Sequence, residues 1–290
     1  DASVFRNGRH IESFAKGAKS NDEIVQLMIG REISAHFRPK PAARATKPLL
    51  EIKNLSWENR LHNVSLSVGR GEIVGLGGLD GQGQKELLLS LFGVLKRVSG
   101  EVVIDGQPHK LTSPREAKAA SPSIALVPED RKTEGLMLSM SIAENLVIAS
   151  LEDLSSGPFV DDGKVSEAVK SAIARLQIKI GSPDDAVSTL SGGNQQKVVI
   201  AKWLVQQCEV LIFDEPTRGI DVGAKQEIYK LINELAAQGR AIILISSELP
   251  EILQISHRIA VMCEGRLTGE LDAREATQEN VMALATQPTV

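Results

Sequence analysis

The sequence predicts an α/β fold with a mainly parallel sheet at its core and an antiparallel β layer beside it. Between residues 50 and 290, short apolar runs alternate with segments of helical periodicity, which is typical of βαβ units. Residues 50–74 alternate strand and turn patterns without a helix, and this stretch predicts the antiparallel layer. Strands are expected at 49–55, 72–78, 123–129, 210–215, 241–247 and 258–265, and helices at 84–93, 113–120, 164–177, 191–207, 223–238 and 248–255.

The composition argues against several classes of protein. The chain has 290 residues, of which 42% are hydrophobic and 24% charged, and its formal net charge is −4, all ordinary values for a globular protein. The charge and the lack of a long basic block argue against nucleic-acid binding, which needs clustered Lys and Arg. No apolar run approaches the roughly 18–20 residues that span a bilayer. Cys208 and Cys263 lie far apart in the sequence and predict structural thiols in a reduced, cytosolic setting.

A predicted linker separates two parts of the chain. Residues 33–48 include the stretch HFRPKPAARATKP, which is rich in Pro, Ala and basic residues and lacks periodicity. Residues 1–32 contain Asn7-Gly8, a strong hairpin-turn signal, and a helical pattern at 21–32 that Asn21 or Ser20 would cap. Residues 49–290 hold the alternating strands and helices of the main domain.

The end of the main domain repeats the layout of residues 1–32. Residues 260–271 align with 3–14 without a gap, and 278–286 then fall on 21–29. The shared order of hairpin, polar linker and capped helix predicts that the first 32 residues are the tail of a preceding copy of the same domain. A chance resemblance between two hairpin–helix units is the alternative. The identical pairs are Val4/Val261, Gly8/Gly265, Arg9/Arg266 and Leu27/Leu284.

The stretch GGLDGQGQKELLLSLFG has the glycine spacing of a phosphate-binding loop between a strand and a helix. Gly78, Gly81 and Gly83 would let the backbone turn sharply and point its N–H groups at phosphate oxygens, at the positive end of a helix. The full pattern continues with a Lys for the terminal phosphates and a hydroxyl for Mg²⁺, but Gln84 and Lys85 occupy these two places. A plain turn is the alternative for this loop taken alone.

Two further motifs strengthen the nucleotide-site interpretation. Residues 210–216, VLIFDEP, form an apolar run that leads into Asp214 and Glu215, an arrangement that supplies a Mg²⁺-facing Asp and a water-activating Glu. Residues 190–197, LSGGNQQK, open a long helix with a Ser and two glycines, a second phosphate-facing helix terminus. In this combination the chain resembles the nucleotide-binding domain of the ABC transporter family over nearly all of residues 49–290.

The resemblance implies a P-loop NTPase fold of the ABC type, with a helical subdomain at about residues 133–207. The tandem layout, LVPEDRKTEGL and LSGGNQQKVVIAKWL resemble the second half of the duplicated ATPases that drive ribose-, galactose- and xylose-type importers. In this family two domains sandwich two ATP molecules with Mg²⁺, each ATP lying between the phosphate loop of one domain and the signature of the other. The signature positions in this chain are Ser191, Gly192, Gly193, Asn194 and Gln195.

Further positions match the family's motifs one by one. Trp57 stands where members place an adenine-stacking aromatic, with a core Trp of the antiparallel layer as the alternative. Glu129 stands at the place of a Gln that senses Mg²⁺ and couples to the membrane subunit, so the role of a carboxylate there is open. Asp221 matches the Asp of the loop that links the two sites, and Ser247 occupies the place of the switch His.

These matches imply two unequal ATP sites. The phosphate Lys, the Mg²⁺ hydroxyl and the switch His are missing from the chain's own site, and a charge-assisted hydrogen bond is worth about 1.5–3 kcal/mol. Lys85 comes one residue later on a helix, so its side chain is expected to point roughly 100° away from that of Gln84. With Asp214 and Glu215 retained, the own site is expected to bind nucleotide weakly and to hydrolyse it slowly or not at all. The signature would instead complete a competent site on the first domain.

The resemblance also implies partners and a location. The partners would be the first ABC domain, transmembrane permease subunits and, indirectly, a sugar-binding protein, at the cytoplasmic face of the membrane and without nucleic acid. Two other classes stay open, which are a non-catalytic regulatory domain of the same fold and a soluble ABC ATPase acting on nucleic acid or ribosomes.

Overall fold

A six-stranded sheet forms the centre of the part of the chain that the computed structural model describes, residues 2–6, 9–19, 23, 27 and 47–287. All neighbouring strands are parallel except the last pair at one edge, which confirms the predicted mainly parallel core. Two of the inner strands, Ile73–Gly77 and Val210–Asp214, are buried at every residue, which explains why they read as continuous apolar runs. In spatial order the strands are β8 (Ile124–Val127), β11 (Val210–Asp214), β12 (Ala241–Ile245), β5 (Ile73–Gly77), β13 (Arg258–Cys263) and β14 (Arg266–Asp272).

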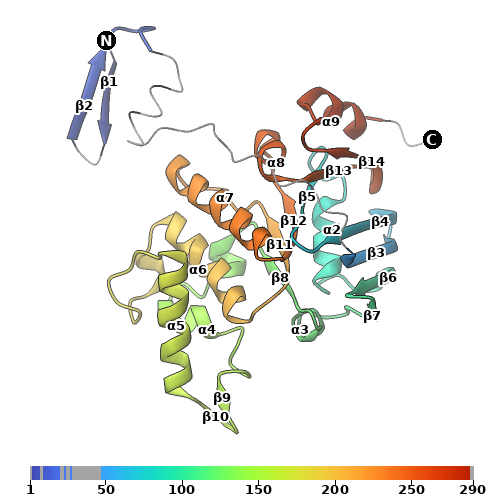
Figure 1. The fold of residues 1–290 in the computed structure, drawn as a ribbon, viewed down its shortest axis with the longest axis horizontal. Coiled ribbons are helices and arrows are strands. Elements are labelled where there is room, and N and C mark those ends of the chain that lie inside the picture. Colours follow the sequence, from blue (N-terminus) through green and yellow to red (C-terminus); the bar gives the residue numbers. More distant parts are fainter. Residues whose placement is uncertain (1, 7–8, 20–22, 24–26, 28–46, 288–290) are drawn as a thin grey trace.

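An antiparallel sheet lies beside the parallel one, as the sequence predicts. Figure 1 shows it on the opposite side of the parallel strands from the helices of residues 142–205. Arg258 of β13 links the two sheets by donating from Nη2 to the backbone oxygen of Ser67, at 2.7 Å. In spatial order the antiparallel strands are β4 (Leu61–Gly69), β3 (Pro48–Trp57), β6 (Ser99–Ile104) and β7 (Gln107–His109).

The helices that accompany the sheets begin and end close to the predicted positions. The helix after β5 starts directly at the end of the glycine-rich loop, where Gly83 takes the N-cap position. These helices are α2 (Gln84–Leu91), α3 (Pro114–Ala119), α7 (Val222–Ala237), α8 (Leu249–Ile255) and α9 (Gln278–Ala285). None of the helices in the described part of the chain has the length and apolar character needed to cross a membrane.

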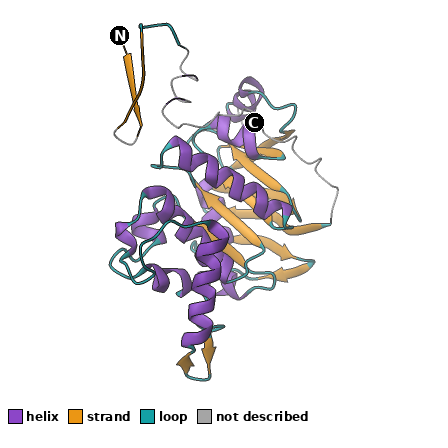
Figure 2. Ribbon diagram, turned by 60° about the vertical axis from the view of Figure 1, so that its left-hand side comes forward, coloured by secondary structure: helices purple, strands orange, loops and turns teal. Residues whose placement is uncertain are grey.

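A helical subdomain is inserted between β8 and β11, and Figure 2 shows its helices to one side of the strands. Its short helix α4 was not predicted from the sequence, although Ser141 and Glu144 form a capping box at its start. The subdomain contains a π-helical turn (Arg131–Gly135), α4 (Ile142–Val147), the small hairpin of β9 (Ser155–Ser156) and β10 (Phe159–Val160), α5 (Asp162–Leu176), a 3-10 turn (Val187–Thr189) and α6 (Gly192–Val205).

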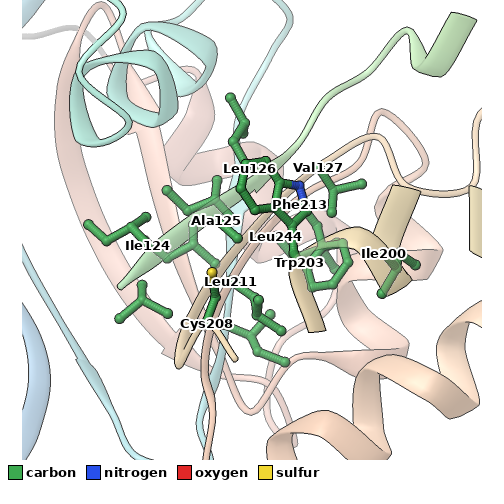
Figure 3. Packing of buried hydrophobic residues seen from close by; sticks show 14 of the residues in the cluster. Ile124, Ala125, Leu126, Val127, Ile200, Trp203, Cys208, Leu211, Phe213 and Leu244 are labelled. Carbon is green, nitrogen blue, oxygen red and sulfur yellow. The ribbon is translucent and has the colours of Figure 1, made fainter. Parts of the chain in front are cut away.

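The core continues from the parallel sheet into this helical subdomain. Figure 3 shows Ile200 and Trp203 of α6 among side chains of β8 and β11, with Phe213 fully buried. Trp203 also meets Phe92 edge to face, with ring centroids 5.8 Å apart. The helix that carries the signature motif is therefore fixed to the strand that carries Asp214.

A separate hairpin occupies the start of the chain. Strands β1 (Ala2–Arg6) and β2 (Arg9–Phe14) pair antiparallel on either side of Asn7-Gly8. That turn, nearly all of the predicted helix at 21–32 and most of the predicted linker lie outside the described residues. The register of this hairpin shifts between Val4 and Phe5. The register of β13 and β14 shifts between Val261 and Met262, which are the aligned positions of the predicted repeat.

Candidate functional site

The glycine-rich loop connects β5 to α2, as the phosphate-loop interpretation requires. Gly78 has a φ of 145° and Gly83 a φ of 106°, conformations that side chains rarely allow. A Cβ at Gly78 would lie 2.6 Å from the backbone oxygen of Met262, so the chain packs too tightly there for any side chain. Gly81 also has a positive φ, of 75°, at the outer part of the loop. The loop therefore presents backbone at the N-terminus of α2, which is the geometry that holds phosphate oxygens.

The side chain of Gln84 packs against the glycine-rich loop. Its side chain is 7% exposed, and Nε2 donates to the backbone oxygen of Leu79 at 3.0 Å. The amide therefore binds the protein's own loop at the place where the family has a phosphate-binding Lys. The structure thus supports the expectation that Gln84 and Lys85 point to different partners.

Lys85 points to the carboxyl ends of β8 and β11. Its Nζ lies 2.6 Å from Oε2 of Glu129 and 4.0 Å from Oδ2 of Asp214. Arg218 pairs with the other carboxylate oxygen of Glu129. The structure therefore gathers three of the predicted site residues, one cation and two carboxylates, and adds Arg218, which the sequence analysis did not single out.

Glu215 lies directly after β11 and faces the predicted switch position. Its carboxylate accepts hydrogen bonds from the backbone nitrogen of Ser247 and, at 3.1 Å, from its hydroxyl. Burial raises the pKa of Glu215 above its ordinary value, although these hydrogen bonds oppose the shift. Burial likewise raises the pKa of Asp214, against the nearby charge of Lys85. Ser247 therefore holds the candidate catalytic carboxylate through two hydrogen bonds.

A buried carboxylate that was not predicted from the sequence contacts the chain on both sides of the Glu215–Ser247 pair. Glu251 of α8 is 4% exposed and accepts hydrogen bonds from the hydroxyls of Thr217, at 2.7 Å, and Ser246, at 2.8 Å. Lys225 of α7 lies 2.9 Å from its other oxygen. Since Thr217 and Ser246 flank Glu215 and Ser247 in the chain, Glu251 fixes both segments that carry the candidate catalytic groups.

The signature residues form the first turn of α6. Ser191 occupies the N-cap position and is exposed, and its hydroxyl accepts a hydrogen bond from Nδ2 of Asn194 at 3.1 Å. Gly193 packs on α7, where an added Cβ would lie 2.6 Å from Cβ of Ala224. Gly192 has little more room, because Arg131 lies against it. Packing on α7 therefore requires a glycine at 193, whereas the group nearest Gly192 is the end of the flexible Arg131 side chain. The helix start remains available to a phosphate group.

Arg131 joins the signature helix to the segment after Glu215. Its stretch of the sequence, PEDRKTEG, predicts either a charged surface turn or a contact to a membrane subunit. Its guanidinium donates to the backbone oxygens of Arg218, at 2.9 Å, and Gly219, at 3.2 Å. Nε also lies 3.4 Å from Oε1 of Gln195 in the signature. Burial lowers the pKa of this guanidinium, which nonetheless stays charged. The partners of Arg131 are far away in the sequence, so no local pattern could have identified it.

Two other predicted residues lie at the edges of this region. Trp57, at the end of β3, is half-buried against the core, and its indole nitrogen donates to the backbone oxygen of Lys96 at 3.0 Å. Its adenine-stacking role stays a prediction. Asp221 caps α7 by accepting from the backbone nitrogen of Ala224 at 2.9 Å.

Comparisons with known proteins agree with this geometry. The family model described as ABC transporter matches residues 61–218. A ribose import ATP-binding protein of Mesorhizobium japonicum is 50% identical over 97% of this chain and 55% of that protein, and one of Geobacillus kaustophilus is 46% identical over 98% and 57%. The chain therefore spans about half the length of these curated relatives.

Solved structures show the same fold. CbiO1 of Clostridium perfringens, part of an ABC transporter complex, superposes with a TM-score of 0.68 at 25% identity, over 81% of this chain and 92% of that chain. A nucleotide-free ATP-binding cassette from an ABC transporter gives the same TM-score at 22% identity, over 83% and 96%.

Proposed function

Because the chain belongs to the ABC transporter family, we propose that it is the C-terminal ATP-binding half of a duplicated ATPase that drives monosaccharide import. The names of relatives at 50% and 46% identity, both for ribose import, support this choice of cargo class. The half-length match to these relatives and the aligned register shifts in the two hairpins support the tandem arrangement. In this proposal residues 1–32 are the tail of the first domain, 33–48 the linker and 49–290 the second domain.

The two ATP sites of the tandem protein would do different work. The competent site would hold ATP and Mg²⁺ on the phosphate loop of the first domain, completed by Ser191 and its neighbours at the start of α6 in this chain. The chain's own site would bind nucleotide weakly. One observation supports this division. The side-chain amide of Gln84 donates to the backbone oxygen of Leu79, and the ammonium of Lys85 donates to the carboxylate of Glu129. Gln84 then lacks the charge that the family's Lys brings to the phosphates, and Lys85 lacks the Mg²⁺ ligand that the family's hydroxyl provides.

The proposed partners follow from the same role. ATP hydrolysis can drive uptake only through a membrane-spanning pathway, so the tandem protein would bind permease subunits at the cytoplasmic face of the membrane. A sugar-binding protein would act indirectly, by delivering the cargo to the permease. No role for nucleic acid is proposed, in keeping with the net charge of −4.

Deletion of the encoding gene from its host tests the cargo assignment. We expect the deletion strain to lose uptake of at least one of radiolabelled ribose, galactose and xylose, and a plasmid copy of the tandem protein to restore it. Uptake of an unrelated amino acid serves as the control and should not change. Normal uptake of all three sugars by the deletion strain would contradict the proposal.

A regulatory domain without catalysis of its own is the second candidate, favoured by the engagement of Gln84 and Lys85 with protein groups. The two candidates differ in what they predict for ATP turnover by the tandem protein. Turnover depends on the signature of this chain in the first candidate and does not depend on it in the second. A ribosome- or nucleic-acid-directed ATPase is the remaining alternative, and RNA that co-purifies with the tandem protein would favour it.

A further inference from the structure

Two departures from the family pattern meet in one ion pair. Lys85 stands at the place of the Mg²⁺ hydroxyl, and Glu129 stands at the place of a neutral Gln. These positions are 44 residues apart, yet Nζ of Lys85 donates to Oε2 of Glu129 at 2.6 Å. A hydroxyl and an amide have thus been replaced by a cation and an anion that match each other in charge and in position.

Asp214 completes the surroundings of the Lys85 ammonium. Its side chain is 8% exposed, and its Oδ2 lies 4.0 Å from Nζ. Arg218 pairs with the other oxygen of Glu129, so two cations accompany the carboxylates of Glu129 and Asp214. The ammonium of Lys85 therefore lies among the three positions at which the family holds or senses Mg²⁺.

Mg²⁺ does not fit this arrangement. The ion requires near-octahedral oxygen ligands at about 2.0–2.1 Å. Here the ammonium of Lys85, which has donors only, lies near the carboxylates of Glu129 and Asp214. It also stands where the family has the hydroxyl that is a ligand of Mg²⁺. A divalent cation beside Lys85 would also be repelled by its charge.

We propose that the ammonium of Lys85 takes the place of Mg²⁺ in the chain's own nucleotide site, so that this site binds ADP and ATP without a divalent cation. The inference rests on the proposed function, because it takes the loop of residues 78–83 to be a nucleotide site. Lys85 lies in the first turn of α2, whose N-terminus faces the phosphate position, and about half of its side chain is exposed (49%). The ammonium has three donors, so it can bind a phosphate oxygen while it keeps Glu129.

Calorimetric titration of the 290-residue chain with ADP and with ATP, in EDTA and in excess MgCl₂, tests the proposal. For the wild-type chain we expect the two Kd values for each nucleotide to differ by less than about threefold. Lys85→Thr restores the family's hydroxyl, and Lys85→Thr combined with Glu129→Gln restores both positions. We expect these variants to bind about tenfold or more weakly in EDTA than in MgCl₂, because a charge-assisted contact is lost until Mg²⁺ replaces it.

Lys110→Thr is the matched control, since it removes the same charge from an exposed loop residue and should leave binding insensitive to Mg²⁺. Wild-type binding that needs Mg²⁺ would overturn this inference and leave the proposed function in place. Absence of nucleotide binding under both conditions would overturn this inference and the assignment of residues 78–83 as a nucleotide site, while the role in sugar import would still be decided by uptake in the deletion strain. A Lys85→Thr variant that binds equally well in EDTA and MgCl₂ would also overturn the role of Lys85. If that variant binds in neither condition, the wild-type comparison decides.

Discussion

Replacement of Ser191 by Arg in the tandem protein is expected to lower ATP turnover and sugar uptake by about tenfold or more. Ser191 is exposed at the N-cap of α6, where the proposal places the triphosphate held by the first domain. An Arg side chain there would fill the space of the terminal phosphates. It would also remove the hydroxyl that accepts from Asn194 at 3.1 Å. Steady-state ATPase assays and uptake in whole cells measure the two effects.

Ser166→Arg is the matched control for this variant. Ser166 is an exposed residue of α5 in the same helical subdomain, so the change adds the same side chain and charge away from the proposed phosphate position. Its turnover should equal that of the wild type. If the tandem protein with Ser191→Arg also hydrolysed ATP at the wild-type rate, the signature of this chain would not contribute to an ATP site. The alternative of a non-catalytic regulatory domain would then be favoured.

Replacement of Glu251 by Ala is expected to lower the free energy of unfolding of this chain by about 3 kcal/mol. The change leaves the buried hydroxyls of Thr217 and Ser246 without their acceptor and removes the buried partner of Lys225. Since these groups fix the segments of Glu215 and Ser247, the loss should be seen first around the site. Urea denaturation measures the free energy, and hydrogen exchange locates the loosened segments.

Glu248→Ala provides the comparison, because Glu248 pairs with the same Lys225 but its side chain is 59% exposed. A change of about 0–1 kcal/mol is expected for it. Equal losses in the free energy of unfolding for the two variants would show that the stabilisation by Glu251 does not depend on its burial.

The contribution of Glu251 should also depend on pH. Burial acts to raise the pKa of this carboxyl, but its hydrogen bonds outweigh burial and hold the pKa below the ordinary value of 4.5. A group with a lowered folded-state pKa stabilises the fold fully above its unfolded pKa and loses this effect as pH falls through the folded value. The difference in stability between the wild type and Glu251→Ala should therefore shrink as the pH falls below about 4.5.

The strands and most helices could be predicted because their signals are local. Continuous apolar runs mark the buried parallel strands, and the glycine loop marks the start of α2 within a few residues. Helix α4 was missed because six residues are too few to show a period, although its capping box was readable at Ser141 and Glu144. The stretch PEDRKTEG could be predicted only as a charged surface turn or as a contact to a membrane subunit, and the structure gives residues 131–135 one π-helical turn, from which Arg131 donates to the backbone oxygen of Arg218.

The candidate site was predictable only where its motifs are contiguous. Asp214, Glu215 and the signature could be placed on elements from their own neighbours in the sequence. The pairing of Lys85 with Glu129 and the contacts of Arg131 with Gly219 depend on how β5, β8, β11 and α6 pack together. Spacing along the chain contains no information on such pairs, so the sequence could identify the departures at 85 and 129 but not their connection.

ATP hydrolysis by the 290-residue chain alone, with Mg²⁺, tests the unequal division of the two sites most directly. Nucleotide binding, measured in the same preparation, establishes that the chain is folded. We expect binding together with hydrolysis no faster than the buffer blank. Rapid, Mg²⁺-dependent hydrolysis that is lost in Glu215→Gln would contradict the account, because the chain's own site would then be a complete ATPase.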